Sequence, residues 1–340
     1  MALPVTKGRL LALVDAFAGR RLVVAGDFVL DRFIYGHPKR VSREAPVLIL
    51  QFWKEENLPG GAGNTAANVR ALGGVPVPVG ATGADEAGRL LRDALRRAGI
   101  ATEGLVEVAG YRTPTKTRLL GGAPHGIKQQ VARYDVDDVL PPDAADAAGT
   151  AARLGAAAAA AHGAILSDYG YGAISPAAVP VLRGALPPGA RVCVDSRHRL
   201  AEYAGVDAAT PNEEELEESS GASLHDSEEN LDAAGAALRR RMRCGTLLVT
   251  RGSRGMALFE EEGGPRRIPV HGTDQVADVT GAGDTVLATF SLALSAGASP
   301  LEAALLANFA GGVVVMKMGT AVASAEELKA AVESDRALLS

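Results

Sequence analysis

The run Asp278-Val-Thr-Gly-Ala-Gly-Asp284 places a bare backbone between two carboxylates. An apolar helical stretch, Val286–Leu294, follows it directly, so the glycines stand where a helix begins. N–H groups in the first turn of a helix lack partners within the helix, and the helix dipole favours negative charge beside them. The Gly281–Gly283 backbone therefore predicts an anion site for a phosphoryl group in transfer. Asp284, in the same turn, is the candidate general base for an attacking hydroxyl.

A helix start without chemistry is the alternative interpretation of this run. Glycine would then allow close packing, and Asp284 would only place a charge at the helix N-terminus. Asp278 and Thr280 favour the chemical interpretation, because they add polar groups where a nucleotide or a cation would lie.

A second pattern is Thr210-Pro-Asn-Glu-Glu-Glu215, which follows the apolar run Val206–Ala209. Asn212 and Glu215 are three residues apart and face the same way on a starting helix, where they could hold Mg²⁺ through water beside nucleotide phosphates. Asn212 could equally be a helix cap followed by solvated acids, and the hexapeptide leaves both interpretations open.

The glycine-rich segment Val249–Gly255 could border a nucleotide at the end of a strand. A hairpin turn into a following strand, Met256–Phe259, explains it equally well.

Two early segments have residue types that suit sugar hydroxyls, namely Gly26–Asp31 and Leu58–Asn68. The glycines of the second segment would let the backbone approach a ligand closely. Its Gly61-Ala-Gly63 portion resembles a dinucleotide-binding fingerprint, but Lys54–Pro59 separates it from any strand that could lead into it. A Walker A loop is also absent, because Gly110–Thr117 has no glycine before its lysine.

Short apolar runs alternate with helical patterns and must position these residues. The order predicts βαβ units, a parallel sheet and helices on both faces, with ligands at the carboxyl ends of the strands. The predicted strands are Arg21–Gly26, Val75–Gly80, Ala164–Ser167, Arg191–Asp195, Ala208–Thr210 and Thr246–Thr250. The predicted helices include residues 6–18, Glu86–Ala98, Asp143–Ala161, Gly281–Ala296, Pro300–Met316 and Ala325–Ser334.

Two segments, Phe33–Trp53 and Thr113–Tyr134, lack helical periodicity. They predict strand pairs that project from the α/β body as a small β-sheet lid, and long loops are the alternative. We expect a single domain over residues 1–340 that includes this lid.

The composition excludes several classes of protein. The chain has 340 residues, of which 47% are hydrophobic and 22% charged, and its net charge of −5 gives no sign of a nucleic-acid partner. No stretch approaches twenty apolar residues, so we expect no membrane span. The N-terminus lacks the pattern of a signal peptide, and Cys193 and Cys244 have no partner pattern, which predicts a reduced cytoplasmic protein. The scattered histidines show no zinc-ligand spacing.

These motifs, in this order, resemble the ribokinase-like (PfkB) sugar kinases over about residues 20–330. The resemblance implies a Rossmann-type three-layer α/β sandwich with a small projecting β-sheet lid, often used for dimerisation. It also implies a small-molecule sugar substrate, ATP, Mg²⁺ and, as in several relatives, a monovalent cation such as K⁺. Within the family the sequence is most similar to the kinases that phosphorylate D-glycero-D-manno-heptose 7-phosphate at C1. The segments that support this are Gly26–Gly36, Arg40–Val47, Leu166–Gly172, and Asn308 with Gly311–Thr320.

The resemblance assigns roles residue by residue. Asp284 would be the base, with the anion hole formed by Gly281, Ala282 and Gly283. The residues near the nucleotide would be Asn212, Glu215, Thr250, Gly252, Thr280 and Asn308, with Glu215 holding Mg²⁺ through water and Asp278 bordering the monovalent cation. The residues facing the sugar would be Asp27, Asp31, Gly60, Gly61, Asn64, Asn68, Lys116, Arg133, Asp168 and Arg197.

The sequence departs from the heptose kinases at two positions, where Tyr171 and Arg197 stand in place of their usual lysines. An arginine fork is not equivalent to an ammonium point charge. The cations that could replace a lost phosphate contact are Lys116, Lys128, Arg133 and Arg197. Two other functions therefore stay open, a kinase for an unphosphorylated sugar or nucleoside and a catalytically silent binding protein. Heptose kinases are often fused to a nucleotidyltransferase domain, for which we expect no room in 340 residues.

Overall fold

The computed structural model describes residues 5–123, 126, 128–147, 149–272, 278–335 and 338. Its strands are β1 (Arg21–Gly26), β2 (Phe28–Val41), β3 (Leu48–Gly61), β4 (Val75–Gly83), β5 (Leu105–Val108), β6 (Thr115–Gly121), β7 (Gln129–Val136), β8 (Gly163–Asp168), β9 (Arg191–Ser196), β10 (Ala208–Ala209), β11 (Thr246–Thr250), β12 (Met256–Phe259) and β13 (Arg266–Ile268).

The helices follow the same order along the chain. They are α1 (Lys7–Asp15), α2 (Ala62–Ala71), α3 (Glu86–Arg97), α4 (Pro142–Ala147), α5 (Thr150–Ala158), α6 (Ala178–Ala185), α7 (Glu213–Ser220), α8 (Glu228–Met242), α9 (Ala282–Ser295), α10 (Pro300–Val314) and α11 (Ala325–Ser334), with short 3₁₀ turns η1 (Leu200–Glu202) and η2 (Gly252–Arg254). In the described ranges, no helix combines the length and the apolar character needed to cross a bilayer.

The main sheet has the strand order β13-β12-β11-β10-β9-β8-β1-β4-β5. Strands β11 to β5 in this order are parallel to their neighbours, as the sequence predicts. At one edge β12 and β13 run antiparallel, and the β11–β12 pair is the hairpin that was one of the two interpretations of Val249–Gly255. Only Arg251–Gly255 connect β11 to β12, and a parallel crossover needs a dozen or more residues.

Helices cover both faces of the main sheet, and alternation along each strand produces this arrangement. On β1, Val24 packs with the layer of α1, α2, α3, α9, α10 and α11. Its neighbour Val23 packs with the layer of α5, α6, α7 and α8. Successive side chains of a strand point to opposite faces, so these nearly continuous apolar runs bury both sides of the sheet.

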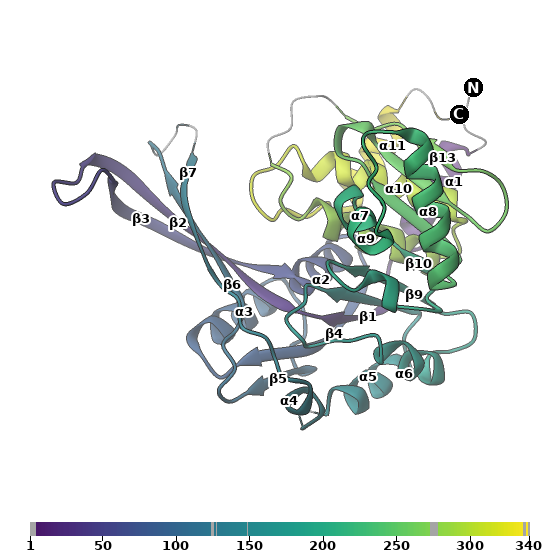
Figure 1. Cartoon of the computed structure of the whole chain (residues 1–340), viewed down its shortest axis with the longest axis horizontal. Coiled ribbons are helices and arrows are strands. Elements are labelled where there is room, and N and C mark those ends of the chain that lie inside the picture. The colour runs from purple at the N-terminus through teal and green to yellow at the C-terminus, as the bar shows by residue number, and fades with distance from the viewer. Residues whose placement is uncertain are drawn as a thin grey trace.

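A second sheet, with the order β3-β2-β6-β7, projects from the body (Figure 1). We call it the projecting sheet. Only Asp27 separates the end of β1 from the start of β2, and α2 begins directly after β3, so the base of this sheet joins the edge of the main one. The structure forms strands in both segments predicted to be extended, although they begin earlier, at Phe28, and end later, at Gly61 and Val136. Residues 124, 125 and 127 of the second segment lie outside the described residues.

Two other predictions concern helices. The prediction of a single helix over Asp143–Ala161 is wrong, because two separate helices, α4 and α5, form there. Gly149, which lies between them, has a left-handed φ of 68°. Residue 148 lies outside the described residues. The three predicted C-terminal helices are present as α9, α10 and α11, with ends that differ by at most two residues.

Candidate active site

Asp284 lies in the first turn of α9, and only 4% of its surface is exposed. Its Oδ1 accepts hydrogen bonds from the Thr65 hydroxyl and the Tyr169 phenol, both at 3.0 Å. Its Oδ2 accepts one from Nδ2 of Asn64 at 2.9 Å. Two donors therefore come from the start of α2 and one from the loop after β8, and together they hold the carboxylate.

The pKa of Asp284 reflects a balance between burial and these donors. The pKa is raised to about 6, because burial and, to a smaller extent, the negative charge of Asp31 raise it by more than the three hydrogen bonds lower it. The carboxylate is thus ionised near neutral pH but basic enough to take a proton, as a general base requires.

The glycine run before α9 supplies unpartnered amides. Gly281 has a φ of 78°, a left-handed conformation that favours glycine, and a side chain there would collide with Nδ2 of Asn64. The predicted anion site included the Ala282 amide, which instead donates to Val279 O in a turn at 3.2 Å. The amides of Gly281, Gly283 and Asp284 have no acceptor within the described ranges, and a Cβ on Gly283 would face open space.

The predicted nucleotide side gathers at the ends of β10 and β11. Asn212 forms a bridge with Thr250, and Gly252 follows in η2. Asn212 and Glu215 form a capping box, in which each side chain accepts the backbone N–H of the other at 2.8 Å. The helix-cap interpretation of this pair is therefore realised. Asn308 on α10 is buried and donates to Pro269 O at 2.9 Å.

Asp195, at the end of β9, is a site residue that the sequence argument did not assign. Its Oδ1 is buried and has no hydrogen-bond partner in the described part of the chain. Burial raises its pKa well above the usual range, and the charges of Glu215 and Asp284 raise it further. The pKa of Glu215 is also raised, first by burial, although Asn212 and Arg197 oppose the shift.

An unpartnered carboxylate oxygen beside a second acid suits a divalent cation. Within the described ranges no three His, Cys, Asp or Glu side chains come together to hold a metal. Asp195 and Glu215 therefore fit Mg²⁺ only if phosphate oxygens complete its shell, which is the usual way that proteins bind this ion.

Asp278 is hydrogen-bonded on both carboxylate oxygens. Oδ1 accepts from the amide and the hydroxyl of Thr280, at 2.9 and 2.7 Å, and Oδ2 accepts from Gly319 N at 3.0 Å. Burial would raise its pKa, but these hydrogen bonds outweigh burial and lower it. The carboxylate stays ionised and joins the loop before α9 to the loop after α10.

Basic side chains converge on the side of Asp284 where the sugar was predicted. Burial lowers the pKa of Lys116, and the positive charges of Arg133 and Arg197 lower it further. The negative charges of Asp31 and Asp284 oppose this shift. These cations thus act on one region from β6, β7 and the end of β9. Arg133 pairs with Asp135, whereas Lys116 and Arg197 form no ion pair with any residue that the structure describes.

Asp31 and its neighbours line the floor of the same region. Arg118 pairs with Asp31 at 2.5 Å, and both side chains are buried. Gly60 lies against the other oxygen of Asp31, because a Cβ there would collide with it.

Three other side chains predicted to face the sugar are engaged within the protein. Asp27 accepts the backbone N–H groups of Tyr169, Tyr171 and Ala173. Asp168 accepts hydrogen bonds from the side chains of Ser196, Arg199 and Tyr203. Asn68 donates to Asn64 and accepts from Thr285. In this conformation the polar groups of these three side chains hydrogen-bond other parts of the protein and so hold the loops and helices around the site in place.

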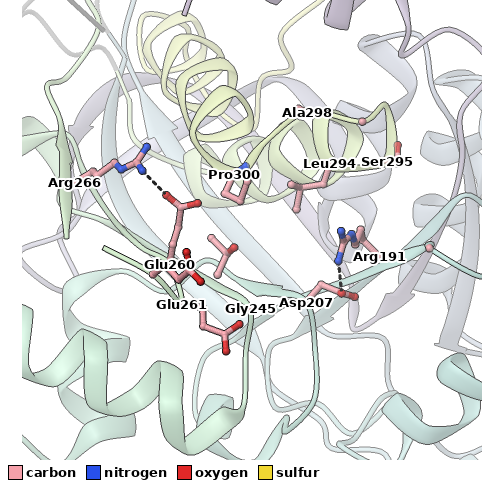
Figure 2. Close-up of a pocket in the computed structure, with 14 residues that line it drawn as sticks. Arg191, Asp207, Gly245, Glu260, Glu261, Arg266, Leu294, Ser295, Ala298 and Pro300 are labelled. Atoms are coloured by element: carbon pink, nitrogen blue, oxygen red, sulfur yellow. Dashed lines mark hydrogen bonds and ion pairs between the residues drawn. The ribbon is translucent and has the colours of Figure 1, made fainter. Parts of the chain in front are cut away.

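A large pocket lies elsewhere, at the opposite end of α9 from Asp284 (Figure 2). Its volume is about 730 Å³, and its lining includes Ser295, Asp207 and Glu260. Arg191 pairs with Asp207 and Arg266 with Glu260 across its walls. Asp284 and Ser295 are eleven residues apart on α9, about 16 Å at 1.5 Å per residue, so this pocket is distinct from the candidate active site.

Residues 21–327 match the pfkB family of carbohydrate kinases. The chain belongs to this family. It is an ATP-dependent carbohydrate kinase, a phosphotransferase that acts on a sugar hydroxyl.

The bifunctional protein HldE of Caulobacter vibrioides is 41% identical to the chain over 328 residues, which are 95% of this chain and 65% of that protein. The chain thus spans less than two thirds of this relative. Arabidopsis thaliana ribokinase, solved with ribose and ATP, superposes with a TM-score of 0.70 at 22% identity over 94% of this chain and all of that one. Phosphofructokinase-2 from Escherichia coli, solved with potassium, superposes with a TM-score of 0.73 at 18% identity. The superposition covers 93% of this chain and 98% of that one. The predicted ribokinase-like fold is confirmed.

Replacing Gly281 with alanine should lower turnover on the order of 10²-fold, because the new Cβ displaces Asn64 and with it a hydrogen bond to Asp284. Gly297→Ala is the matched control. Gly297 also has a left-handed φ, of 88°, at the other end of α9, but a Cβ there meets nothing within 4 Å. Both variants should lose about 1–2 kcal/mol of stability. Equal turnover in the two variants would contradict the role given to the Gly281–Asn64 contact.

Proposed function

We propose that this kinase phosphorylates a sugar that already has a phosphate group, and that the best candidate is D-glycero-D-manno-heptose 7-phosphate, at C1. The proposal depends chiefly on the cations near Asp31. Lys116 stands opposite Asp31 in the register of β2 and β6, and the charges of Arg133 and Arg197 act on Lys116. A second phosphate needs several cations, and a plain sugar does not. The similarity to the bifunctional protein HldE supports the heptose phosphate in particular.

In the proposed reaction, Asp284 is the base for the transfer of the γ-phosphoryl group of ATP to the sugar hydroxyl. The acceptor hydroxyl lies against Asp284 and attacks the γ-phosphorus of ATP, and the bond from that phosphorus to the oxygen of ADP breaks. The hydroxyl proton passes to Asp284, so the products are the sugar phosphate, ADP and a protonated carboxyl group. The amides of Gly283 and of Asp284 itself, which have no acceptor among the described residues, stabilise charge on the transferred group.

Two cations belong to this proposal. Asp195 and Glu215 would hold Mg²⁺, which neutralises charge on the phosphates when bound. Asp278 and Thr280 would border a monovalent cation such as K⁺, and phosphofructokinase-2 from Escherichia coli, which has a similar fold, has been solved with potassium. The free thiols of Cys193 and Cys244 support the prediction of a cytoplasmic enzyme.

We also propose that the projecting sheet pairs two copies of the chain. Large apolar side chains are exposed on and beside it, which is unusual for a surface that stays in water. They are Val41, Val47, Leu48, Phe52, Trp53, Val131 and Tyr134. Sedimentation should show a mass near twice 34.9 kDa, and Phe52→Asp should shift it toward the monomer. A wild-type monomer at micromolar concentration would contradict this pairing.

The substrate is tested by ATP consumption against a panel of heptose 7-phosphate, fructose 6-phosphate, fructose, ribose and nucleosides. We expect the highest kcat/KM with heptose 7-phosphate and a clear preference for phosphorylated acceptors. A preference for an unphosphorylated sugar or a nucleoside would favour the ribokinase type. ATP consumption with none of them would favour a silent binding protein.

Lys116→Met supplies the matched test of the phosphate contact. Loss of a charged hydrogen bond should raise KM for the phosphorylated sugar about 10- to 100-fold and leave KM for ATP unchanged. Lys329→Met, which removes a surface cation paired with Asp15, is the control. Unchanged KM for the sugar phosphate in the Lys116 variant would contradict the phosphate assignment.

A further inference from the structure

Tyr169 lies between a cation of the sugar side and the base. Its phenol donates to Oδ1 of Asp284 at 3.0 Å. The ammonium of Lys116 lies 5.0 Å from the centre of its ring, within the range of a cation–π contact. One side chain therefore touches both the group that takes the proton and a group assigned to substrate binding.

The backbone around Tyr169 is fixed from behind by Asp27. Oδ2 of Asp27 accepts the N–H groups of Tyr169 and Tyr171 at 2.9 and 3.0 Å, and Oδ1 accepts that of Ala173 at 2.9 Å. A loop held at three amides has little freedom to carry the phenol away from Asp284. The loop and β3 can pack this closely because residue 61 is glycine. A Cβ at Gly61 would lie 2.5 Å from the backbone oxygen of Asp27 and 3.4 Å from Cδ2 of Tyr169.

The hydrogen bonds on Asp284 can be counted against its lone pairs. A carboxylate has about four acceptor sites, two on each oxygen. Thr65 and Tyr169 occupy both sites of Oδ1, and Asn64 occupies one of Oδ2. Counting the described residues, one site remains, and it lies on Oδ2.

We propose that Tyr169 is a positioning residue that closes Oδ1 and so directs the proton of the sugar hydroxyl to Oδ2 of Asp284. This inference rests on the proposed role of Asp284 as the base. The phenol must stay protonated to donate, and it does, because burial and the nearby charge of Asp284 raise its pKa well above the ordinary value. A donor to the charged form also stabilises the carboxylate, so it opposes the effect of burial on Asp284.

Tyr169→Phe removes the donor and keeps the ring. We expect kcat to fall about 10- to 100-fold with little change in KM for the sugar, since a hydrogen bond to a charged group is lost. Without that donor the pKa of Asp284 rises, so the variant should lose more activity at pH 6 than at pH 8. Tyr171→Phe is the matched control, because that phenol belongs to the same loop but donates to Asp137.

A titration that needs no substrate separates this inference from the proposed function. In protein labelled with ¹³C at the aspartate carboxyls, the resonance absent from Asp284→Asn identifies Asp284, and it should titrate at about 6 in the wild type. It should titrate at higher pH in Tyr169→Phe and at the wild-type pH in Tyr171→Phe. An unshifted resonance in Tyr169→Phe would overturn the role of Tyr169 whatever the panel of sugars shows. If no compound of the panel is phosphorylated but the Asp284 resonance shifts in Tyr169→Phe, only the proposed function is overturned.

Discussion

The carboxylate of Asp284 is buried at the start of a helix, and three donors from two distant segments keep it ionised there. Burial favours the protonated form, so without these donors the group would be a poorer base at neutral pH. The start of α2, the start of α9 and the loop after β8 must therefore meet at one point. Because the folded-state pKa lies above the ordinary value, this carboxylate contributes most to stability below pH 4, and the contribution is lost as pH rises through about 6. The enzyme keeps a reactive group at some cost in stability.

The rest of the site is arranged around that point according to charge. Burial raises the pKa of Asp195 and Glu215, and such a pair of acids suits a cation that also binds phosphates. Lys116 stands opposite Asp31 in the register of β2 and β6. The charge of Arg197 acts on both Glu215 and Lys116. The amides of Gly283 and Asp284 have no acceptor among the described residues.

Local sequence predicted the parts of this arrangement that depend on local rules. The glycine run before an apolar stretch predicted the start of α9 and the position of Asp284, because helix starts have a strong residue pattern. Alternating apolar runs predicted the parallel strands, and the absence of helical periodicity predicted the strands of the projecting sheet. The segment Val249–Gly255 left two interpretations open, a nucleotide border and a hairpin turn, and the antiparallel pairing of β11 with β12 shows that the hairpin forms.

Long-range contacts could not be predicted in the same way. Tyr169 lies 115 residues from Asp284, and nothing in its own segment indicates that its phenol reaches the base. Asp195 was named only as the last residue of a predicted strand, although the ends of parallel strands are where ligands bind in such folds. Asp27 has the type and place of a sugar ligand, which stays a prediction, and its segment gave no sign that its carboxylate accepts three backbone N–H groups of the loop after β8.

The most direct test of the account is the turnover of Asp284→Asn beside its affinity for ATP. Loss of a carboxylate base typically costs on the order of 10²–10⁴-fold in rate, and the nucleotide contacts assigned to Thr250, Gly252 and Asn308 do not involve this side chain. We therefore predict a fall in kcat of at least about 10²-fold with an ATP Kd close to that of the wild type. Retention of more than about a tenth of the wild-type rate would contradict the assignment of Asp284 as the base.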